Sequence, residues 1–199
     1  MDAIPLWMTL AYTGFLTVLV PAYWATYGPA NFLWFSDLAL LVTGVALWLE
    51  SSLLASAMAV GVLLPELVWN VSYFGRLVTG TRFTSLADYM FDPKQSRVIR
   101  GLSLVLHVVL PATLVWMLAR LGYDSRALIT QTAVAWIVFP VTYLVTDPGT
   151  NINWVFGFGH PPRRWLSPRM HLLMLMAGFP VLVYLPTHFL LRAIFEAHQ

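Results

Sequence analysis

Three ionisable residues, Asp37, Glu66 and His107, lie within apolar segments of this sequence, where side chains of their kind could do chemistry. A charge at the centre of a bilayer costs at least about 2.5 kcal/mol, so an ionisable residue inside an apolar helix marks a functional site by default. Carboxylates and an imidazole can exchange protons or bind cations. The three residues are therefore the candidate catalytic set.

Three kinds of chemistry fit this set, and the sequence leaves them open. In the first, His107 acts as a general acid or base, and Asp37 or Glu66 orients it. In the second, the two carboxylates and the imidazole bind a divalent metal ion, although residues on separate segments form no fixed ligand motif. In the third, they relay protons or cations. The sequence specifies neither a metal nor any other cofactor.

Each of the three residues also has a structural explanation. Asp37 could stabilise the N-terminus of its own helix, where anions are favoured. Glu66 could be protonated and hydrogen-bonded to a neighbouring helix, and His107 could be a structural histidine whose hydrogen bonds are satisfied. The hypothesis of a site depends on the three residues occurring together.

The composition indicates which solvent surrounds these segments. The chain has 199 residues, of which 59% are hydrophobic and 10% are charged, whereas a soluble domain has about 25% charged residues. So few charges cannot cover a water-soluble protein of this size, and we expect a membrane protein whose partners include lipids. The basic residues lie at loop positions and do not indicate a nucleic-acid partner. The sequence contains no cysteine, which excludes disulfides and thiolate nucleophiles.

Six apolar segments are long enough to cross a bilayer, which takes roughly 20 residues as a helix. They are predicted at residues 5–24, 32–49, 53–74, 101–121, 127–145 and 170–191. The second and third are separated only by residues 49–52, which predict a tight turn. The sequence thus predicts an all-α fold, a polytopic integral membrane bundle of about six transmembrane helices that forms a single domain over residues 1–199.

An even number of helices places both termini on the same side of the membrane. That side carries three basic residues, whereas the connections 75–100 and 146–169 carry eight. By the positive-inside rule, the side with more basic residues faces the cytoplasm. We therefore expect the termini to face outwards and the long connections to lie in the cytoplasm.

The three ionisable residues reach a common depth when counted inward from the cytoplasmic ends of their helices. Asp37 lies about 9 Å in, Glu66 roughly 12 Å and His107 roughly 10 Å. This coincidence predicts a polar cavity that opens towards the cytoplasm, with these side chains at its floor. Asn70 shares a helix face with Glu66, and Ser103 shares one with His107. The residues expected around the mouth of the cavity are Asn31, Asp147, Asn151, Asn153 and His171.

The connection TDPGTNINWVFGFGHPPRRW, residues 146–165, is unusually specific in composition for a link between two apolar helices. Asp147 begins a turn signal, and Asn151 and Asn153 would point the same way in an extended segment. Such a segment could cover the cavity and bind a ligand through its amides. Arg163 and Arg164 lie at headgroup level, where they could hold phosphate. The alternative is an interfacial loop with aromatic anchors and orienting arginines.

Prolines and tryptophans lead to two further expectations. A proline within a helix frees the carbonyl four residues earlier, and Pro111 frees that of His107. In lipid this carbonyl needs another donor, so the kinks should face other helices or a wet cavity, unless they are ordinary packing kinks. Tryptophans near the predicted helix ends, Trp69 among them, are interpreted as interfacial anchors.

Four stretches resemble an uncharacterised family of bacterial multi-pass membrane proteins: YGPANFLWFSDLALL, LLPELVWN, HVVLPATLVWMLARLGYDSRAL and TDPGTNINWVFGFG. The likeness covers residues 27–191. More distantly, the six-helix layout is similar to integral-membrane lipid acyltransferases and to fatty-ester hydrolases of the androgen-induced type. Those families use a threonine or cysteine nucleophile with a histidine in the bundle. The resemblance places Asp37 on the nucleophile's helix and His107 at the position of the histidine.

Two main functional hypotheses follow. The first is a membrane-embedded enzyme that acts on a lipid or another hydrophobic substrate by acyl transfer or hydrolysis, with Asp37, Glu66 and His107 as catalytic residues. Its substrate-binding residues would be Asn70, Asp147, Asn151, Asn153, Arg163, Arg164 and His171.

The second hypothesis is a non-catalytic subunit of a larger electron-transfer or photosynthetic membrane complex, which packs against partner helices, lipids or pigments. For either function we expect a place in the bacterial inner membrane, with periplasmic termini and cytoplasmic long loops. A small transporter is less favoured, because transporters commonly carry internal repeats and this sequence has no obvious one.

Overall fold

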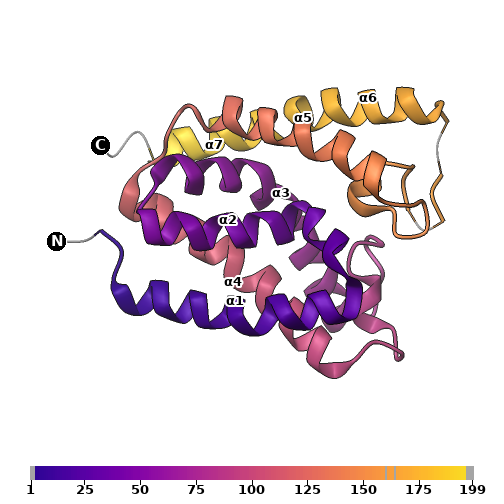
Figure 1. Ribbon diagram of the computed structural model, residues 1–199, viewed down its shortest axis with the longest axis horizontal. Helices are drawn as coiled ribbons and strands as arrows, with labels where there is room; N and C mark the ends of the chain where they lie inside the picture. The colour runs from indigo at the N-terminus through magenta and orange to yellow at the C-terminus, as the bar shows by residue number, and fades with distance from the viewer. Residues whose placement is uncertain (1–2, 160, 164, 196–199) are drawn as a thin grey trace.

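The computed structural model describes residues 3–159, 161–163 and 165–195 (Figure 1). Over these residues the long helices are α1 (Leu6–Tyr27), α2 (Phe35–Leu49), α3 (Ser52–Thr79), α4 (Arg97–Leu121), α5 (Ala127–Val145), α6 (Pro168–Phe179) and α7 (Leu185–Phe195). Three short 3₁₀ segments are η1 (Pro29–Leu33), η2 (Asp88–Phe91) and η3 (Ile152–Trp154). A π-helical turn, η4 (Pro180–Tyr184), joins α6 to α7 without a break.

Five helices in the described part of the chain are long and apolar enough to cross a membrane: α1, α3, α4, α5 and the continuous stretch Pro168–Phe195. Helix α2 is also apolar, but with 15 residues it is shorter than these five helices. The prediction of an all-α, multi-pass membrane bundle of about six helices is therefore confirmed. The largest boundary differences are at α3, which continues to Thr79, at α4, which already begins at Arg97, and at α7, which continues to Phe195.

The helices lie alongside one another, and their connections alternate between the two ends of the bundle (Figure 1). The start of α1 and the end of α7 lie at one end, and the long connections that follow α3 and α5 lie at the other. Helix α3 is central, because it packs against α2, α4, α5 and α7. In an apolar stretch of 18 residues of α3, 56% of the residues are buried, against 22% in the corresponding stretch of α1.

Small side chains allow α3 to approach its neighbours closely. Residues 55–62, with the sequence ASAMAVGV, are all buried. At Gly61, an added Cβ would lie 2.5 Å from Nε2 of Gln131 on α5, a side chain that is only 1% exposed. Small residues at such interfaces are the usual means of helix packing in lipid, where apolar burial gives helices no reason to associate.

The π-helical turn allows the helix to continue past Pro180. The N–H of Leu185 donates to the carbonyl of Pro180, five residues earlier. Since Pro180 has no N–H, the carbonyl of Met176 loses its helical donor. The indole N–H of Trp136 on α5 donates to that oxygen at 2.9 Å, and this bond ties α5 to α6.

The tight turn predicted at residues 49–52 is present and also holds the start of the chain. Glu50 ends α2 with a left-handed φ of 47°, and Ser51 caps the start of α3. The Glu50 carboxylate accepts the N–H groups of Ala3 and Ile4 at 3.2 and 2.9 Å. One acidic residue thus satisfies two backbone donors just before α1 begins.

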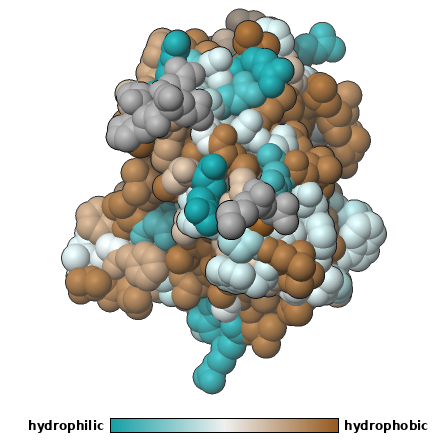
Figure 2. All heavy atoms as spheres, turned by 90° about the vertical axis from the view of Figure 1, so that its left-hand side faces the viewer, coloured by the Kyte–Doolittle hydropathy of each residue, from teal (hydrophilic) through white to brown (hydrophobic). Residues whose placement is uncertain are grey.

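Apolar side chains cover much of the outer surface of the bundle, as contact with lipid requires. Figure 2, which views the end that holds the start of α1, shows brown, hydrophobic atoms along the flanks and hydrophilic patches between them. Among the large exposed apolar residues are Ile129, Leu144 and Leu182 on the helices α5 and η4.

We expect Gly61→Ala to destabilise the bundle, because the new methyl group would overlap the buried amide of Gln131. Overpacking of this kind costs about 1–3 kcal/mol. Thermal unfolding of the detergent-solubilised protein measures the effect. Gly14→Ala on α1 is the matched control, since its Cβ would meet nothing within 4 Å. Equal midpoints for the two variants would contradict the close contact between α3 and α5.

Candidate functional site

Glu66 on α3 and His107 on α4 form a direct pair between two adjacent helices. Oε2 of Glu66 lies 2.7 Å from Nδ1 of His107. The Glu66 side chain is 3% exposed and that of His107 is 13% exposed, so water screens their interaction far less than it would at the surface. The contact places these two residues at the same level of the bundle, as their predicted common depth requires.

The hydrogen bonds around His107 are compatible with a neutral ring beside an ionised carboxylate. In that state Glu66 only accepts, so Nδ1 of His107 donates to it. Nε2 of the neutral ring is then an acceptor, and the hydroxyl of Tyr89 donates to it across 3.0 Å. Oγ of Ser103 lies 2.7 Å from the same hydroxyl and donates to it in this arrangement. The four side chains form a continuous chain of hydrogen bonds.

Tyr89 reaches His107 from outside the long helices. It belongs to η2, in the connection between α3 and α4. Burial of its hydroxyl raises the pKa of Tyr89 above the usual value of a phenol, so the group stays protonated and remains a donor at neutral pH. Tyr89 as a whole is nevertheless 36% exposed, so another part of this side chain reaches the protein surface.

Trp69 packs flat against His107 and forms an apolar wall of the site. The two ring centroids lie 4.0 Å apart with an interplanar angle of 20°. The interpretation of Trp69 as an interfacial anchor is wrong, because the residue is only 5% exposed and packs in a small cluster with Ala87 and Met90. The stacking restricts the plane in which the imidazole can lie.

Asn70, one turn after Glu66, links the backbones of α3 and α4. Its Nδ2 donates to the carbonyls of Glu66 and His107, each at 2.8 Å. The His107 carbonyl lacks a helical donor because residue 111 is proline. The expectation that another helix supplies the missing donor is therefore confirmed. The amide nitrogen predicted to bind substrate is engaged with the backbone instead.

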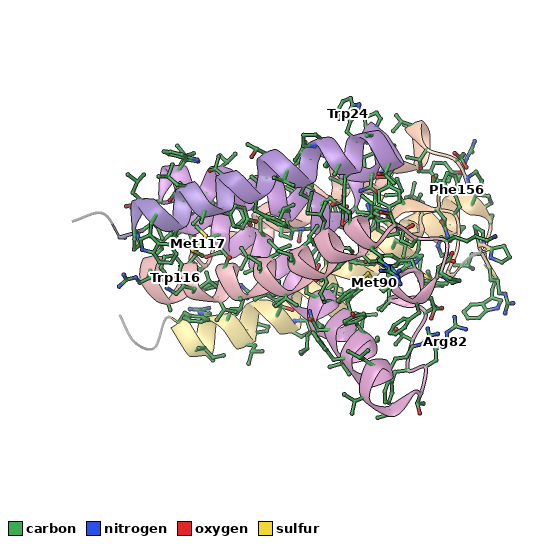
Figure 3. The ribbon with its side chains drawn as sticks, turned by 90° about the horizontal axis from the view of Figure 1, so that it is seen from below. Trp24, Arg82, Met90, Trp116, Met117 and Phe156 are labelled. Carbon is green, nitrogen blue, oxygen red and sulfur yellow. The ribbon has the colours of Figure 1, made fainter. Side chains whose placement is uncertain are left out.

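The connection between α3 and α4, residues 80–96, folds back over the Glu66–His107 pair, and we refer to it as the strap. Asp88 of the strap pairs with Arg76, at 2.8 Å, and with Arg82. Figure 3 shows Met90 of the strap beside α4, with Arg82 farther out near the end of α3. The strap thus occupies the side of the pair on which an open cavity was predicted.

Asp37 lies apart from the hydrogen-bonded chain. It occupies the first turn of α2, is 5% exposed, and accepts a hydrogen bond from Nδ2 of Asn31 at 3.1 Å. No hydrogen bond joins Asp37 to Glu66 or His107 among the described residues. Its first-turn position agrees with the structural explanation, stabilisation of a helix N-terminus. The structure therefore brings two of the three candidate catalytic residues into contact.

The three residues do not form a metal centre. Across residues 3–159, 161–163 and 165–195, no group of three or more His, Cys, Asp or Glu side chains is placed to hold a metal ion. Glu66 and His107 instead bond to each other. Of the three chemistries left open by the sequence, the acid–base arrangement and the proton relay both match this geometry.

The connection after α5 is a compact turn, so the prediction of an extended segment is wrong. Asn151 and Asn153 have left-handed φ angles of 43° and 50°, a conformation that asparagine tolerates better than most residues. Oδ1 of Asn153 accepts the N–H of Phe35 at 3.2 Å, and its Nδ2 donates to the carbonyl of Leu33 at 2.7 Å. The Asn153 amide thus fastens this turn to the start of α2.

Two other predicted substrate-binding residues hold the turn itself. Nδ2 of Asn151 donates to the carbonyls of Gly157 and Gly159 at 2.8 and 3.0 Å, and its Oδ1 accepts the N–H of Phe156 at 3.1 Å. Asp147 accepts the N–H of Gly149 at 2.7 Å. These contacts give both side chains a clear structural role.

The remaining predicted residues lie on or near the turn after α5. His171 on α6 is 2% exposed, and its Nε2 donates to the carbonyl of Trp154 at 2.9 Å. Arg163 forms a short backbone bridge with Phe158, and its side chain is exposed. Arg164 lies outside the described residues. No hydrogen bond joins the described members of this group to Glu66 or His107, and substrate binding by them stays a prediction.

The two hollows identified on the described surface lie away from the candidate catalytic residues. The larger, about 460 Å³, lies between α5 and the α6–α7 helix and is lined by apolar residues such as Leu128, Trp136 and Val181. The smaller, about 210 Å³, lies beside Ile4 and Glu50. The predicted cytoplasm-facing cavity is not one of them, because strap side chains cover that side of the pair.

Sequence reasoning missed Tyr89 and the part played by Trp69. Tyr89 precedes His107 by 18 residues and lies in a connection without helical periodicity, so the sequence carries no signal of its position. A signal does exist for Trp69. It follows Glu66 by three residues and must therefore share a helix face with it.

The fold and composition together define a multi-pass helical membrane protein. No family model, curated protein or solved structure matches this chain. Its function must therefore be inferred from the geometry and chemistry of the site.

We expect Asn70→Ala to destabilise the protein mainly by leaving the His107 carbonyl without a donor, which costs about 1–3 kcal/mol for a buried group. Pro111→Ala would restore a backbone N–H four residues after His107. In the Pro111→Ala background, Asn70→Ala should therefore cost less. A double-mutant cycle of unfolding free energies measures this coupling, and strictly additive effects would show that Asn70 does not compensate for the proline.

Proposed function

We propose that this protein is a membrane-embedded enzyme that uses His107 as its general acid and base on a lipid or another hydrophobic substrate. The observation that carries the proposal is the chain from Glu66 through His107 to the Tyr89 hydroxyl. A carboxylate bonded to one imidazole nitrogen, with a hydroxyl at the other, is how many hydrolases and acyltransferases prepare their base. The apolar flanks of the bundle support a substrate that is dissolved in the bilayer.

Acyl transfer or hydrolysis suits this arrangement. Nε2 of His107 would take a proton from an attacking water or alcohol, while the oxygen of that water or alcohol bonds to the carbonyl carbon of an ester. Glu66 would stabilise the imidazolium that results. As the ester C–O bond breaks, His107 would return the proton to the leaving alcohol oxygen. The hydroxyl of Tyr89, which occupies Nε2 in this structure, must move aside or pass the proton itself.

Asp37 keeps a supporting place in this proposal. It is a second buried carboxyl group on α2, a helix that packs against both α3 and α4. We therefore assign Asp37 a supporting role at the start of α2, where it accepts from Asn31, and the proton transfers to His107.

The substrate would enter from the cytoplasmic side of the bacterial inner membrane. The eight basic residues at the end with the long connections support this orientation. The resemblance of four motifs to bacterial multi-pass proteins supports the compartment. In this proposal Arg163 and Arg164, which closely precede α6 in the sequence, are contacts for a lipid headgroup.

A non-catalytic subunit of a larger membrane complex is the second candidate, and the hollow of about 460 Å³ favours it. This groove between α5 and the α6–α7 helix is lined by apolar side chains and would accept a partner helix, a lipid chain or a pigment tail. Native mass spectrometry of the gently extracted protein distinguishes the two. A stoichiometric partner protein in every preparation would favour the subunit.

We expect His107→Asn to reduce lipid turnover by about 10²–10⁴-fold, the usual contribution of a general acid–base group. Glu66→Gln should also lower the rate, because an amide cannot stabilise the imidazolium as a carboxylate does. The measurement is release of fatty acids and lyso-lipids from a total bacterial lipid extract by the purified protein in proteoliposomes, followed by mass spectrometry.

His188→Asn is the matched control for this experiment. His188 on α7 is 6% exposed and lies 2.6 Å from the hydroxyl of Tyr123, so it is also a buried histidine paired with a tyrosine. It lies near the opposite end of the bundle and should keep wild-type turnover. A folded His107→Asn protein with wild-type turnover, or a wild-type protein that changes no lipid, would refute the enzymatic function.

A further inference from the structure

Two consecutive residues of the strap take part in different networks. Asp88 pairs with Arg76 and Arg82 at the end of α3, and Tyr89 donates to Nε2 of His107. Because the two are joined by one peptide bond, a shift of the Asp88 backbone away from the arginines would also move Tyr89. This adjacency is the basis for coupling the arginine pair to the access of other molecules to His107.

Arg76 and Arg82 converge on one small anionic group. Oδ1 of Asp88 accepts from Nη1 of Arg76, and Oδ2 pairs with Nη2 of Arg82. Two guanidinium groups on the separate oxygens of one anion are also the arrangement by which arginines bind phosphate. The Arg82 side chain is 60% exposed, and Arg76 and Asp88 are about one-third exposed. Exposed pairs of this kind contribute little to stability, so an external anion can compete with Asp88.

The length of α3 places this arginine pair among lipid headgroups. The helix has 28 residues, which at 1.5 Å per residue span about 42 Å, whereas the hydrocarbon core is about 30 Å thick. The apolar residues Leu77, Val78 and Phe83 beside the arginines are largely exposed, as expected at a membrane interface. Residues 76–100 contain five basic and two acidic side chains, a balance that favours an anionic surface.

Other contacts restrict how far the strap can move. The hydroxyls of Ser72 and Thr84 lie 2.7 Å apart, four residues before Asp88. After it, Nη1 of Arg100 donates to the carbonyl of Met90 at 3.5 Å. These contacts hold the strap on both sides of the Asp88–Tyr89 segment, so the movement that we consider is confined to that segment.

We propose that Arg76 and Arg82 form a binding site for the phosphate group of an anionic membrane lipid, which Asp88 fills in this closed structure. Phosphate binding releases Asp88, moves Tyr89 from His107 and opens the site. This inference rests on the proposed function only for the reaction that follows at the opened site. Lipid binding and exposure of His107 are separate from turnover and are measured without it.

Lipid binding is tested with the full chain in nanodiscs that contain phosphatidylcholine and phosphatidylglycerol. Native mass spectrometry then counts the phosphatidylglycerol retained. Asp88→Asn should raise retention, because it frees both arginines, and Arg76→Gln with Arg82→Gln should lower it. Arg97→Gln is the matched control, since it removes one exposed positive charge at the same end of the bundle and should leave retention unchanged.

Opening is tested by the rate at which diethylpyrocarbonate modifies His107, mapped by peptide mass spectrometry. For the wild type, phosphatidylglycerol should raise this rate by about five-fold or more over phosphatidylcholine alone, the lower end of typical coupling between two sites. Asp88→Asn should react rapidly in both lipids. The Arg76→Gln, Arg82→Gln protein should give the same rate in both lipids, because the anion site is lost.

Inorganic phosphate added to phosphatidylcholine nanodiscs distinguishes the source of the ligand. Opening by phosphatidylglycerol alone identifies a headgroup, and opening by inorganic phosphate identifies a soluble anion at the same arginine pair. Equal His107 reactivity in all conditions, with Asp88→Asn retaining no more lipid than the wild type, overturns the proposal. A protein that binds and opens but turns over no lipid would refute the enzymatic function and leave this site intact.

Discussion

The two hydrogen bonds from Asn70 hold α3 and α4 in the register on which the site depends. Pro111 leaves the His107 carbonyl without a helical donor, and in lipid no water is present to replace it. Asn70 supplies that donor and also bonds to the carbonyl of Glu66. The two residues whose backbones it joins are the two whose side chains meet at 2.7 Å. Satisfying one backbone group therefore brings the carboxylate and the imidazole together.

The same physical rule operates on the other side of the bundle. Pro180 frees the carbonyl of Met176, and the indole of Trp136 donates to it from α5. In both places a proline converts an internal helical hydrogen bond into one between helices. Such bonds matter in a membrane because apolar burial does not favour one helix arrangement over another there. The close packing of α3 against α5 at Gly61 also favours this helix arrangement, through shape complementarity.

The helices were predictable because bilayer thickness and hydropathy together determine where a spanning segment begins and ends. The shared depth of Glu66 and His107 followed from the same counting. Predictions failed where backbone geometry lies outside regular helices. Asn151 and Asn153 adopt left-handed conformations that no periodicity reveals. Tyr89 is placed by the folding of the strap, which depends on contacts between distant residues such as Ser72 and Thr84. The strap also covers the side on which a cavity was expected.

The Glu66–His107 pair is difficult to explain as a device for stability. Removing a carboxylate and an imidazole from water carries a desolvation cost that their interaction often fails to recover. Asn70 already joins α3 to α4 without any charge, so the fold does not need the pair for that purpose. An apolar pair of similar volume would be the simpler solution in lipid. We interpret the shielded carboxylate and imidazole, which bond on to the hydroxyl of a partly exposed tyrosine, as groups placed for proton transfer.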